Sequence, residues 1–200
     1  MTNAERAKFA KELANLANEL VPTDTIREVS AKIPEINRLP TEHEERIWLL
    51  QQQEPDAVCV RSAIYRLSGS LSVSKLVSSI YETILAMPDL NARYYFDKEG
   101  GLRRHISARE SECVAIRVVG SRYELIEAVL VRQSETWDPE RVPPFRAELF
   151  LTGSDAYIAL FLNRILDEAY TPEFLVRALM GAYEGRRPET AQRRYSPFSF

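Results

Sequence analysis

A group of polar and charged residues directly follows an apolar run late in the chain. Within residues 161–169, the apolar run gives way to Asn163–Arg164, then two apolar residues, then Asp167–Glu168. Functional side chains of α/β proteins often stand where a strand ends and the next helix begins. This stretch is therefore the first candidate for chemistry. The alternative is a charged loop in which Arg164 pairs with Glu168, an interaction worth little at a surface.

The histidines and cysteines give weaker signals. His43 lies among glutamates at the start of a predicted helix and His105 follows two arginines, so we expect both on solvated surfaces. Cys59 and Cys113 lie in strand-like patterns and are predicted to be small core residues. Two histidines without a Cys/His cluster predict no metal site, and two cysteines cannot form a disulfide framework.

Composition and missing motifs exclude several classes of function. The chain has 200 residues, 45% of them hydrophobic and 28% charged, which predicts one folded domain with a real core. It contains no G-x-x-x-x-G-K, G-x-G-x-x-G or G-x-S-x-G motif. The net charge of −3 predicts no nucleic-acid partner, and without a long apolar run we expect no membrane partner. A reducing, cytoplasmic setting is therefore expected.

Alternating strand and helix patterns position the candidate stretch. The patterns predict strands over residues 58–67, 90–96, 114–119, 145–151 and 156–162, and helices over residues 42–53, 73–87, 123–132 and 172–183. We expect a charged hairpin at residues 97–101 to join the strands 90–96 and 114–119. The last two strands read as a hairpin that runs into the candidate stretch. This order predicts a layered α/β domain.

A helical extension is predicted before this domain. Phe9, Leu13, Leu16 and Leu20 follow one another at helical spacing, and a short second helix would end before Pro34. Residues 1–36 therefore read as a helical hairpin. We expect its apolar stripe to pack on the chain's own core; the alternative is a docking or oligomerisation helix.

Four segments, in order, match the signatures of one known family. Residues 39–55 contain Arg46, Ile47 and Trp48, as in the family's opening signature, and residues 67–76 match its strand–Gly–Leu–helix segment. Residues 137–149 are similar to its Phe-Asp-Leu…Pro-Leu-Arg-Ala segment, and residues 163–169 occupy the place of its His-His-x-x-x-Asp-Gly motif. Residues 39–184 thus resemble the N-terminal half of the condensation domain of nonribosomal peptide synthetases.

The resemblance implies a fold and a division of the chain. The family domain has two chloramphenicol-acetyltransferase-like lobes, and its acceptor and donor channels meet between them. The resemblance thus implies a single lobe, a mixed sheet with flanking helices, over residues 37–185. Residues 186–200 would form an Arg-rich and aromatic tail. We expect no cofactor of the chain's own, apart from phosphopantetheine-tethered substrates that carrier proteins would bring.

The candidate motif departs from the family at each defining position. The family's second His, its proposed catalytic residue, is Arg164 here, and Asn163 replaces the first His. Glu168 replaces the Asp and Ala169 the Gly. A guanidinium stays protonated, so Arg164 cannot accept a proton from an attacking amine, although it can neutralise an anion. The family's Asp pairs with an Arg near the position of Asn91, and Asn91 cannot replace that Arg.

Three hypotheses for function follow. In the first, the chain is a catalytically degenerate interaction or accessory module of nonribosomal peptide biosynthesis, as is the X domain of glycopeptide synthetases, which also carries Arg at the second motif position. In the second, it is a half-enzyme that completes an amide-forming acyl-transfer site with a lobe supplied by itself or a partner. In the third, it is a fragment of a larger synthetase. We favour the first, with a second lobe, a synthetase module, a carrier protein or another copy as partner.

The C-terminal tail is the predicted interface. It combines arginines with aromatic rings, the residue types that dominate interface energetics. We expect it to lie across a neighbouring lobe; the alternative is a frayed terminus. The candidate interface residues are Arg193, Arg194, Tyr195, Phe198 and Phe200.

Overall fold

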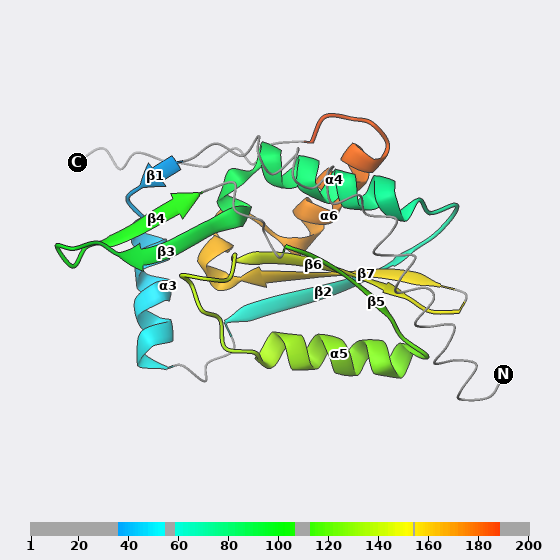
Figure 1. The fold of residues 1–200 in the computed structure, drawn as a ribbon, viewed down its shortest axis with the longest axis horizontal. Helices are drawn as coiled ribbons and strands as arrows, with labels where there is room; N and C mark the ends of the chain where they lie inside the picture. The colour runs from blue at the N-terminus through cyan, green and yellow to red at the C-terminus, as the bar shows by residue number, and fades with distance from the viewer. Residues whose placement is uncertain (1–35, 55–58, 107–112, 154, 189–200) are drawn as a thin grey trace.

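The computed structural model describes residues 36–54, 59–106, 113–153 and 155–188 (Figure 1). The predicted helical hairpin, up to residue 35, lies outside the described residues. The candidate interface residues of the tail, at positions 193–200, also lie outside them. Both stay predictions.

A four-stranded mixed sheet forms the centre of the domain. Its strand order is β2-β7-β6-β5, in which β5 runs parallel to β6 and the other neighbours are antiparallel. The strands are β2 (Val60–Leu67), β5 (Val114–Val118), β6 (Phe145–Leu151) and β7 (Ala156–Asn163). The predicted mixed sheet and the predicted hairpin of the last two strands are confirmed.

A second, three-stranded antiparallel sheet lies beside it, in the order β1-β4-β3 (Figure 1). Its strands are β1 (Ile36–Arg38), β3 (Ala92–Phe96) and β4 (Leu102–Ile106). The charged turn therefore joins β3 to β4, and the prediction that it leads to residues 114–119 is wrong. β4 was missed because Arg104 stands at one of its buried positions and breaks the apolar alternation. β1 was not expected either.

Helices cover both faces of the four-stranded sheet (Figure 1). One face carries α4 (Val73–Ala86) and α6 (Pro172–Tyr183), and the opposite face carries α5 (Arg122–Ser134). α3 (Glu42–Gln53) stands at the end of the sheet nearest the three-stranded sheet. The four predicted helices are confirmed, α3 and α6 with the predicted bounds.

Two short 3-10 helices complete the described elements. η1 (Pro88–Asn91) precedes β3, so the predicted strand at residues 90–96 begins two residues late, because Pro88 opens a helical turn. η2 (Arg164–Leu166) follows β7 directly and contains the next three residues of the candidate motif, whose first residue, Asn163, ends β7. In the described residues, no helix is both long and apolar enough to cross a bilayer.

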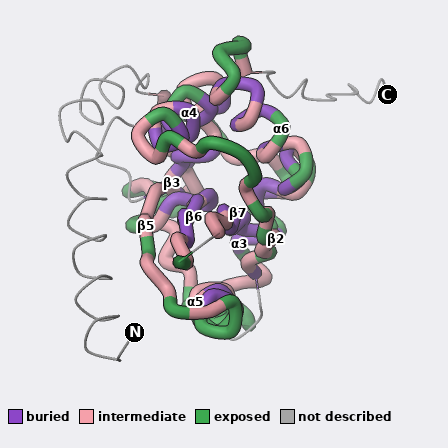
Figure 2. Tube along the Cα trace, turned by 90° about the vertical axis from the view of Figure 1, so that its right-hand side faces the viewer, coloured by how far each residue is buried: buried purple, intermediate pink, exposed green. Residues whose placement is uncertain are grey.

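The central strand β7 divides its side chains between two cores, as the alternation of a strand requires. Leu160 and Leu162 join the large core beneath α4 and α6, whereas Ala159 and Phe161 join a smaller core beneath α5. Figure 2 shows the buried strands in the middle of the molecule and exposed residues along α5. Cys59 and Cys113 are both buried and unbridged, as predicted.

Candidate functional site

Asn163 is the last residue of β7, and a main-chain hydrogen bond, a side-chain hydrogen bond and a strand pairing hold it in place. Its N–H donates to the Pro144 carbonyl at 2.7 Å, and its side-chain Oδ1 accepts from the Ile165 N–H at 2.9 Å. The residue is 1% exposed and pairs with Val60 of β2. Asn163 therefore acts as the cap that starts η2, in the way that asparagine caps helix N-termini.

Arg164 is held by its main chain while its side chain reaches outward. Its N–H donates to the Cys59 carbonyl at 2.8 Å, and its side chain is 46% exposed. The guanidinium Nε lies 3.7 Å from Asp167 Oδ2. The alternative that paired Arg164 with Glu168 is therefore wrong, because the η2 turn places Asp167, three residues on, beside Arg164.

His43, to which the sequence analysis gave no role in the motif, lies beside the motif turn. Its Nε2 donates to the main-chain carbonyl of Arg164 at 3.1 Å. Its Nδ1 lies 3.3 Å from Arg46 Nη2 and 3.5 Å from Glu168 Oε1. Its side chain is only 10% exposed, so the expectation of a solvated His43 is wrong. Only the packing of α3 against η2 reveals the contact.

A salt bridge links the motif to β2. Arg61 Nη2 lies 2.5 Å from Asp167 Oδ1, with both side chains partly exposed. The sequence analysis did not anticipate this pair, because Arg61 lies in β2, far from the motif along the chain. Asn91 instead is buried and accepts from Arg93 at 3.1 Å.

The rest of the motif closes the turn. The N–H groups of Ala169 and Tyr170 both donate to the Leu166 carbonyl at 3.0 Å. Ala169 is half-buried and packs against the large core. Glu168 points outward and is 65% exposed. The structure thus brings Asn163, Arg164 and Ala169 into one turn, but leaves the side chain of Glu168 to solvent and His43.

A small pocket of about 100 Å³ adjoins Asn163. Asn163 is one of the residues that line it, and its side-chain Nδ2, which is buried from solvent, has no hydrogen-bond partner among the described residues. Apolar side chains form much of the wall, and the charged members are Arg132, Glu135 and Arg146. The pocket lies on the α5 side of the sheet, since Phe161 lines it and belongs to the core beneath α5.

A buried carboxylate organises the arginines behind this pocket. The carboxylate of Glu148 in β6 is 0% exposed and accepts hydrogen bonds from Arg117 Nε and Arg132 Nε, each at 2.7 Å. Arg132 also pairs with Glu135. Burial by itself lowers the pKa of the Arg132 guanidinium, but the hydrogen bond to Glu135 and the charge of Glu148 outweigh it and raise that pKa. Arg132 thus stays a fixed cation.

A second buried network fixes α3 and therefore His43. Arg104 Nη1 lies 2.7 Å from Glu44 Oε1, and the Tyr94 hydroxyl donates to the same oxygen at 3.0 Å. Glu44 Oε2 accepts from the Thr41 N–H at 2.7 Å, which completes the capping box of α3. Burial, and next the charge of Glu44, raise the pKa of Tyr94 well above its usual range. Sequence reasoning missed this network entirely.

His105, the second histidine, has a structural contact of its own. Its ring lies in β4 and Nδ1 is 2.7 Å from the side-chain oxygen of Asn37 in β1. The side chain is half-buried, so His105 joins two strands of the small sheet and is not freely solvated. Within the described residues, no group of three or more His, Cys, Asp or Glu side chains is arranged to hold a metal ion.

Curated relatives match most of the chain. It is 29% identical over 153 residues to a dimodular nonribosomal peptide synthase of Bacillus subtilis, which covers 73% of this chain and 6% of that protein. It is 26% identical over 164 residues to the synthetase CymA of Salinispora arenicola, covering 78% of this chain and 2% of that protein. The chain thus spans a small part of the curated relatives it matches. No family model matches it.

Solved structures share the fold. The condensation domain of the monacolin K polyketide synthase MokA superposes with a TM-score of 0.66 at 14% identity, over 75% of this chain and 35% of that one. The chain is related to condensation domains. The X-domain from teicoplanin biosynthesis, solved in complex with OxyB, superposes with a TM-score of 0.63 at 22% identity, over 77% of this chain and 35% of that one.

The condensation-domain relationship confirms the predicted fold. This lobe covers 34% to 40% of the condensation and X-domain chains compared with it. The mixed sheet with flanking helices is the architecture that the resemblance implied. The lobe's own motif turn, built on Asn163 and Arg164, is the candidate site.

Proposed function

We propose that this condensation-domain lobe is a non-condensing interaction module of nonribosomal peptide biosynthesis. The observation that carries the proposal is Arg164 at the second motif position, with its guanidinium beside Asp167 and half exposed. A general base must accept a proton, and a guanidinium does not release its own at any pH that proteins tolerate. The turn therefore has no base where the family's mechanism needs one.

The nearby histidine does not replace the missing base. His43 Nε2 already donates to the Arg164 carbonyl, and its Nδ1 faces Arg46 and Glu168. A base must reach its substrate within hydrogen-bond distance. Both ring nitrogens of His43 contact protein groups, and the ring is 10% exposed. His43 therefore supports the motif turn as a structural contact.

The X-domain from teicoplanin biosynthesis supports the interaction role. That protein has the same lobe in its fold and forms a complex with OxyB. The resemblance noted in the sequence also assigns it an Arg at the second motif position. By this parallel, the present lobe binds a protein partner in peptide biosynthesis, and a carrier protein is one of the partners that the resemblance implies.

The proposal is tested by a condensation assay. The purified chain is mixed with two carrier proteins, one bearing a donor aminoacyl thioester and the other an acceptor, and the acceptor is read by intact-protein mass spectrometry. We expect no amide product from the native chain or from Arg164→His, because the resemblance places the acyl channel between two lobes. An active two-lobed condensation domain serves as the positive control. Amide product from the native chain alone would refute the proposal.

Binding is measured separately. The chain is titrated with a carrier protein by isothermal titration calorimetry, first in the apo form and then in the aminoacyl form. We expect saturable binding of both forms, because an interaction module recognises the protein surface. If neither the apo form nor the aminoacyl form binds, the proposal that a carrier protein is the partner is wrong.

A further inference from the structure

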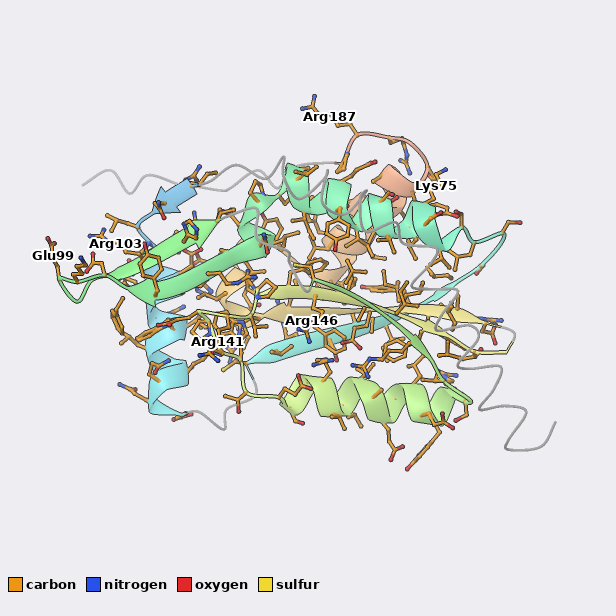
Figure 3. The ribbon with its side chains drawn as sticks, viewed as in Figure 1. Lys75, Glu99, Arg103, Arg141, Arg146 and Arg187 are labelled. Carbon is orange, nitrogen blue, oxygen red and sulfur yellow. The ribbon has the colours of Figure 1, made fainter. Side chains whose placement is uncertain are left out.

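The outer face of α5 carries an exposed apolar stripe. Tyr123, Ile126 and Leu130, which we call the α5 stripe, are 71%, 41% and 59% exposed and follow one another at spacings of three and four residues. Residues at such spacings lie on one face of a helix. A different face packs on the sheet, because Leu125 and Val129 are buried in the core beneath α5. Figure 3 shows side chains that project from α5 away from the sheet.

This group of exposed apolar side chains distinguishes α5 from the other helices. Among the described residues, nine large apolar side chains are exposed, and four of them lie on α5, the fourth being Val131. The other described helices contribute only Leu49 of α3. Single exposed apolar residues are ordinary, whereas a contiguous group marks a surface that another element or molecule covers.

A segment outside the described residues has a matching pattern. From the sequence, residues 1–20 are predicted to form a helix with an apolar stripe of Phe9, Leu13, Leu16 and Leu20, which we call the N-terminal stripe. Its residues follow one another at spacings of four, three and four, the repeat with which one helix packs along another. The spacings of three and four in the α5 stripe therefore fit the N-terminal stripe in either direction.

The chain between the two stripes is long enough for this contact. The fifteen residues 21–35 lead from the N-terminal stripe to β1. Fully extended, they reach about 50 Å, and with the predicted short second helix they still reach about 35 Å. A compact domain of about 150 residues has a radius of gyration of about 15 Å, so this reach is sufficient for either face of the lobe.

Charged residues beside the two stripes favour one direction. Glu5, Glu12 and Glu19 recur every seven residues along one side of the N-terminal stripe. On α5, Arg122 and Glu127 lie on opposite sides of the stripe, and both are exposed. Antiparallel packing places Glu19 beside Arg122, whereas parallel packing places Glu12 beside Glu127. Charges that flank a helix pair select its direction in this way, so the antiparallel arrangement is favoured.

A second copy of the chain fits the α5 stripe less well. A two-fold axis pairs identical helices antiparallel, and each side of the stripe then faces the same side of its partner. Glu127 would face Glu127 of the other copy, and Arg122 would face Arg122. Like charges beside a helix pair are destabilising, so the N-terminal stripe is the better occupant.

We infer that residues 5–20 pack as an antiparallel helix on the α5 stripe, with Leu16 opposite Tyr123, Leu13 opposite Ile126 and Phe9 opposite Leu130. The N-terminal segment thus covers the face of α5 that the described elements leave exposed. This intramolecular docking surface goes beyond the protein-binding role proposed above and does not depend on it. It implies that a protein partner binds the lobe elsewhere than on the α5 stripe.

The direction is tested in the full chain with two cysteine pairs that share Leu130→Cys. Phe9→Cys is the partner in antiparallel packing, and Leu20→Cys is the partner in parallel packing. A disulfide requires Cα atoms within about 7 Å. Under mild oxidation at low protein concentration, we expect the pair with Phe9→Cys to form a disulfide within one chain at least tenfold faster than the pair with Leu20→Cys. Peptide mapping by mass spectrometry distinguishes these bonds from any that involve the buried Cys59 and Cys113.

Three outcomes would overturn the inference. The first is equal or faster disulfide formation in the pair with Leu20→Cys, because the antiparallel direction would then be wrong. The second is a disulfide that forms only between two chains, which would assign the α5 stripe to a second copy. The third is the absence of a disulfide between the introduced cysteines in either variant.

Hydrogen–deuterium exchange tests the contact without cysteines. We expect Leu130→Glu to make the amides of residues 9–20 exchange at least tenfold faster than in the native chain, because a charge on the α5 stripe would oppose packing of the N-terminal stripe. Leu49→Glu is the matched control, since Leu49 is 53% exposed on α3 and lies outside the α5 stripe. Unchanged exchange of residues 9–20 in Leu130→Glu, or equal acceleration in Leu49→Glu, would overturn the inference.

Discussion

His43 and Arg164 are joined across most of the domain. The ring Nε2 of His43 donates to the main-chain carbonyl of Arg164 at 3.1 Å, although the two residues are 121 positions apart in the sequence. The bond attaches the first turn of α3 to η2. The position of the candidate motif therefore depends on a side chain from the opposite end of the described chain.

Removing this ring should loosen the motif turn. We expect His43→Ala to lower the free energy of unfolding by about 1 kcal/mol, the usual cost of one lost hydrogen bond. Hydrogen–deuterium exchange should become faster at residues 164–170, because η2 loses its contact with α3. His105→Ala is the matched control, since His105 contacts Asn37 in the small sheet. Equal acceleration at the turn in both variants would show that the His43 contact has no specific role.

Tyr94 should give the protein a marked alkaline sensitivity. Burial and the charge of Glu44 raise its pKa in the folded state, whereas the unfolded state titrates at about 10. A raised folded pKa stabilises the protein fully below the unfolded pKa, and this contribution is lost as the pH rises toward the folded pKa. We expect the free energy of unfolding of Tyr94→Phe to fall less steeply above pH 10 than that of the native chain, as measured by urea titration.

At neutral pH, the same variant measures how much the hydrogen bond from Tyr94 to Glu44 contributes to stability. Tyr94→Phe keeps the ring but removes the hydroxyl that donates to Glu44, and we expect a loss of about 1 kcal/mol. Parallel stability curves of the two proteins above pH 10 would contradict the assignment of the alkaline loss to Tyr94.

Glu148 should be the most sensitive charged residue of the described sheet. It is fully buried between Arg117 and Arg132, and removing one partner of a buried ion pair costs about 3–5 kcal/mol. We expect Glu148→Ala to destabilise the chain toward that magnitude in urea unfolding, reduced by the partial exposure of both arginines. Glu184→Gln provides a control, because its pair with Arg186 is exposed and should contribute less than about 1 kcal/mol. If Glu148→Ala lowers the free energy of unfolding as little as Glu184→Gln does, the prediction that Glu148 is the more sensitive residue is wrong.

The salt bridge of Arg61 and Asp167 should contribute little to stability. Both side chains are partly exposed, at 46% and 24%, and such pairs contribute about 0.2–1 kcal/mol. A double-mutant cycle with Arg61→Met and Asp167→Asn should give a coupling free energy in that range, decreasing with added salt. A coupling above about 2 kcal/mol would show that the pair is effectively desolvated.

The helices were the most predictable part of the fold. Thr41 and Thr171 each cap the helix that follows them, and Pro172 stands at the first helical position, so local signals fixed both helix starts. The hairpin of β6 and β7 was equally visible, because both strands and their turn are continuous in the sequence. Local rules were sufficient where the partners of a residue are also its neighbours in the chain.

Buried charge was the main obstacle to predicting the rest. β4 was missed because Arg104 is buried against Glu44, a pairing that apolar periodicity cannot represent. The partner strand of the charged turn was consequently misassigned. At the site, the sequence located the turn and its residues Asn163 and Arg164, but could not show that His43 and Arg61 meet it. Both come from elements far away in the chain, and their side chains are of types that are normally solvated.

The pairing of β2 with β7 also determines when the site can form during folding. Val60 is opposite Asn163, so β2 gains its only described strand partner from a segment synthesised much later. Closing so long a loop is entropically costly, and domains rich in such distant pairings fold slowly. The motif turn can therefore form only after β7 has been synthesised, and until then β2 lacks this strand partner and presents unpaired backbone groups, a feature that makes partly folded chains prone to aggregation.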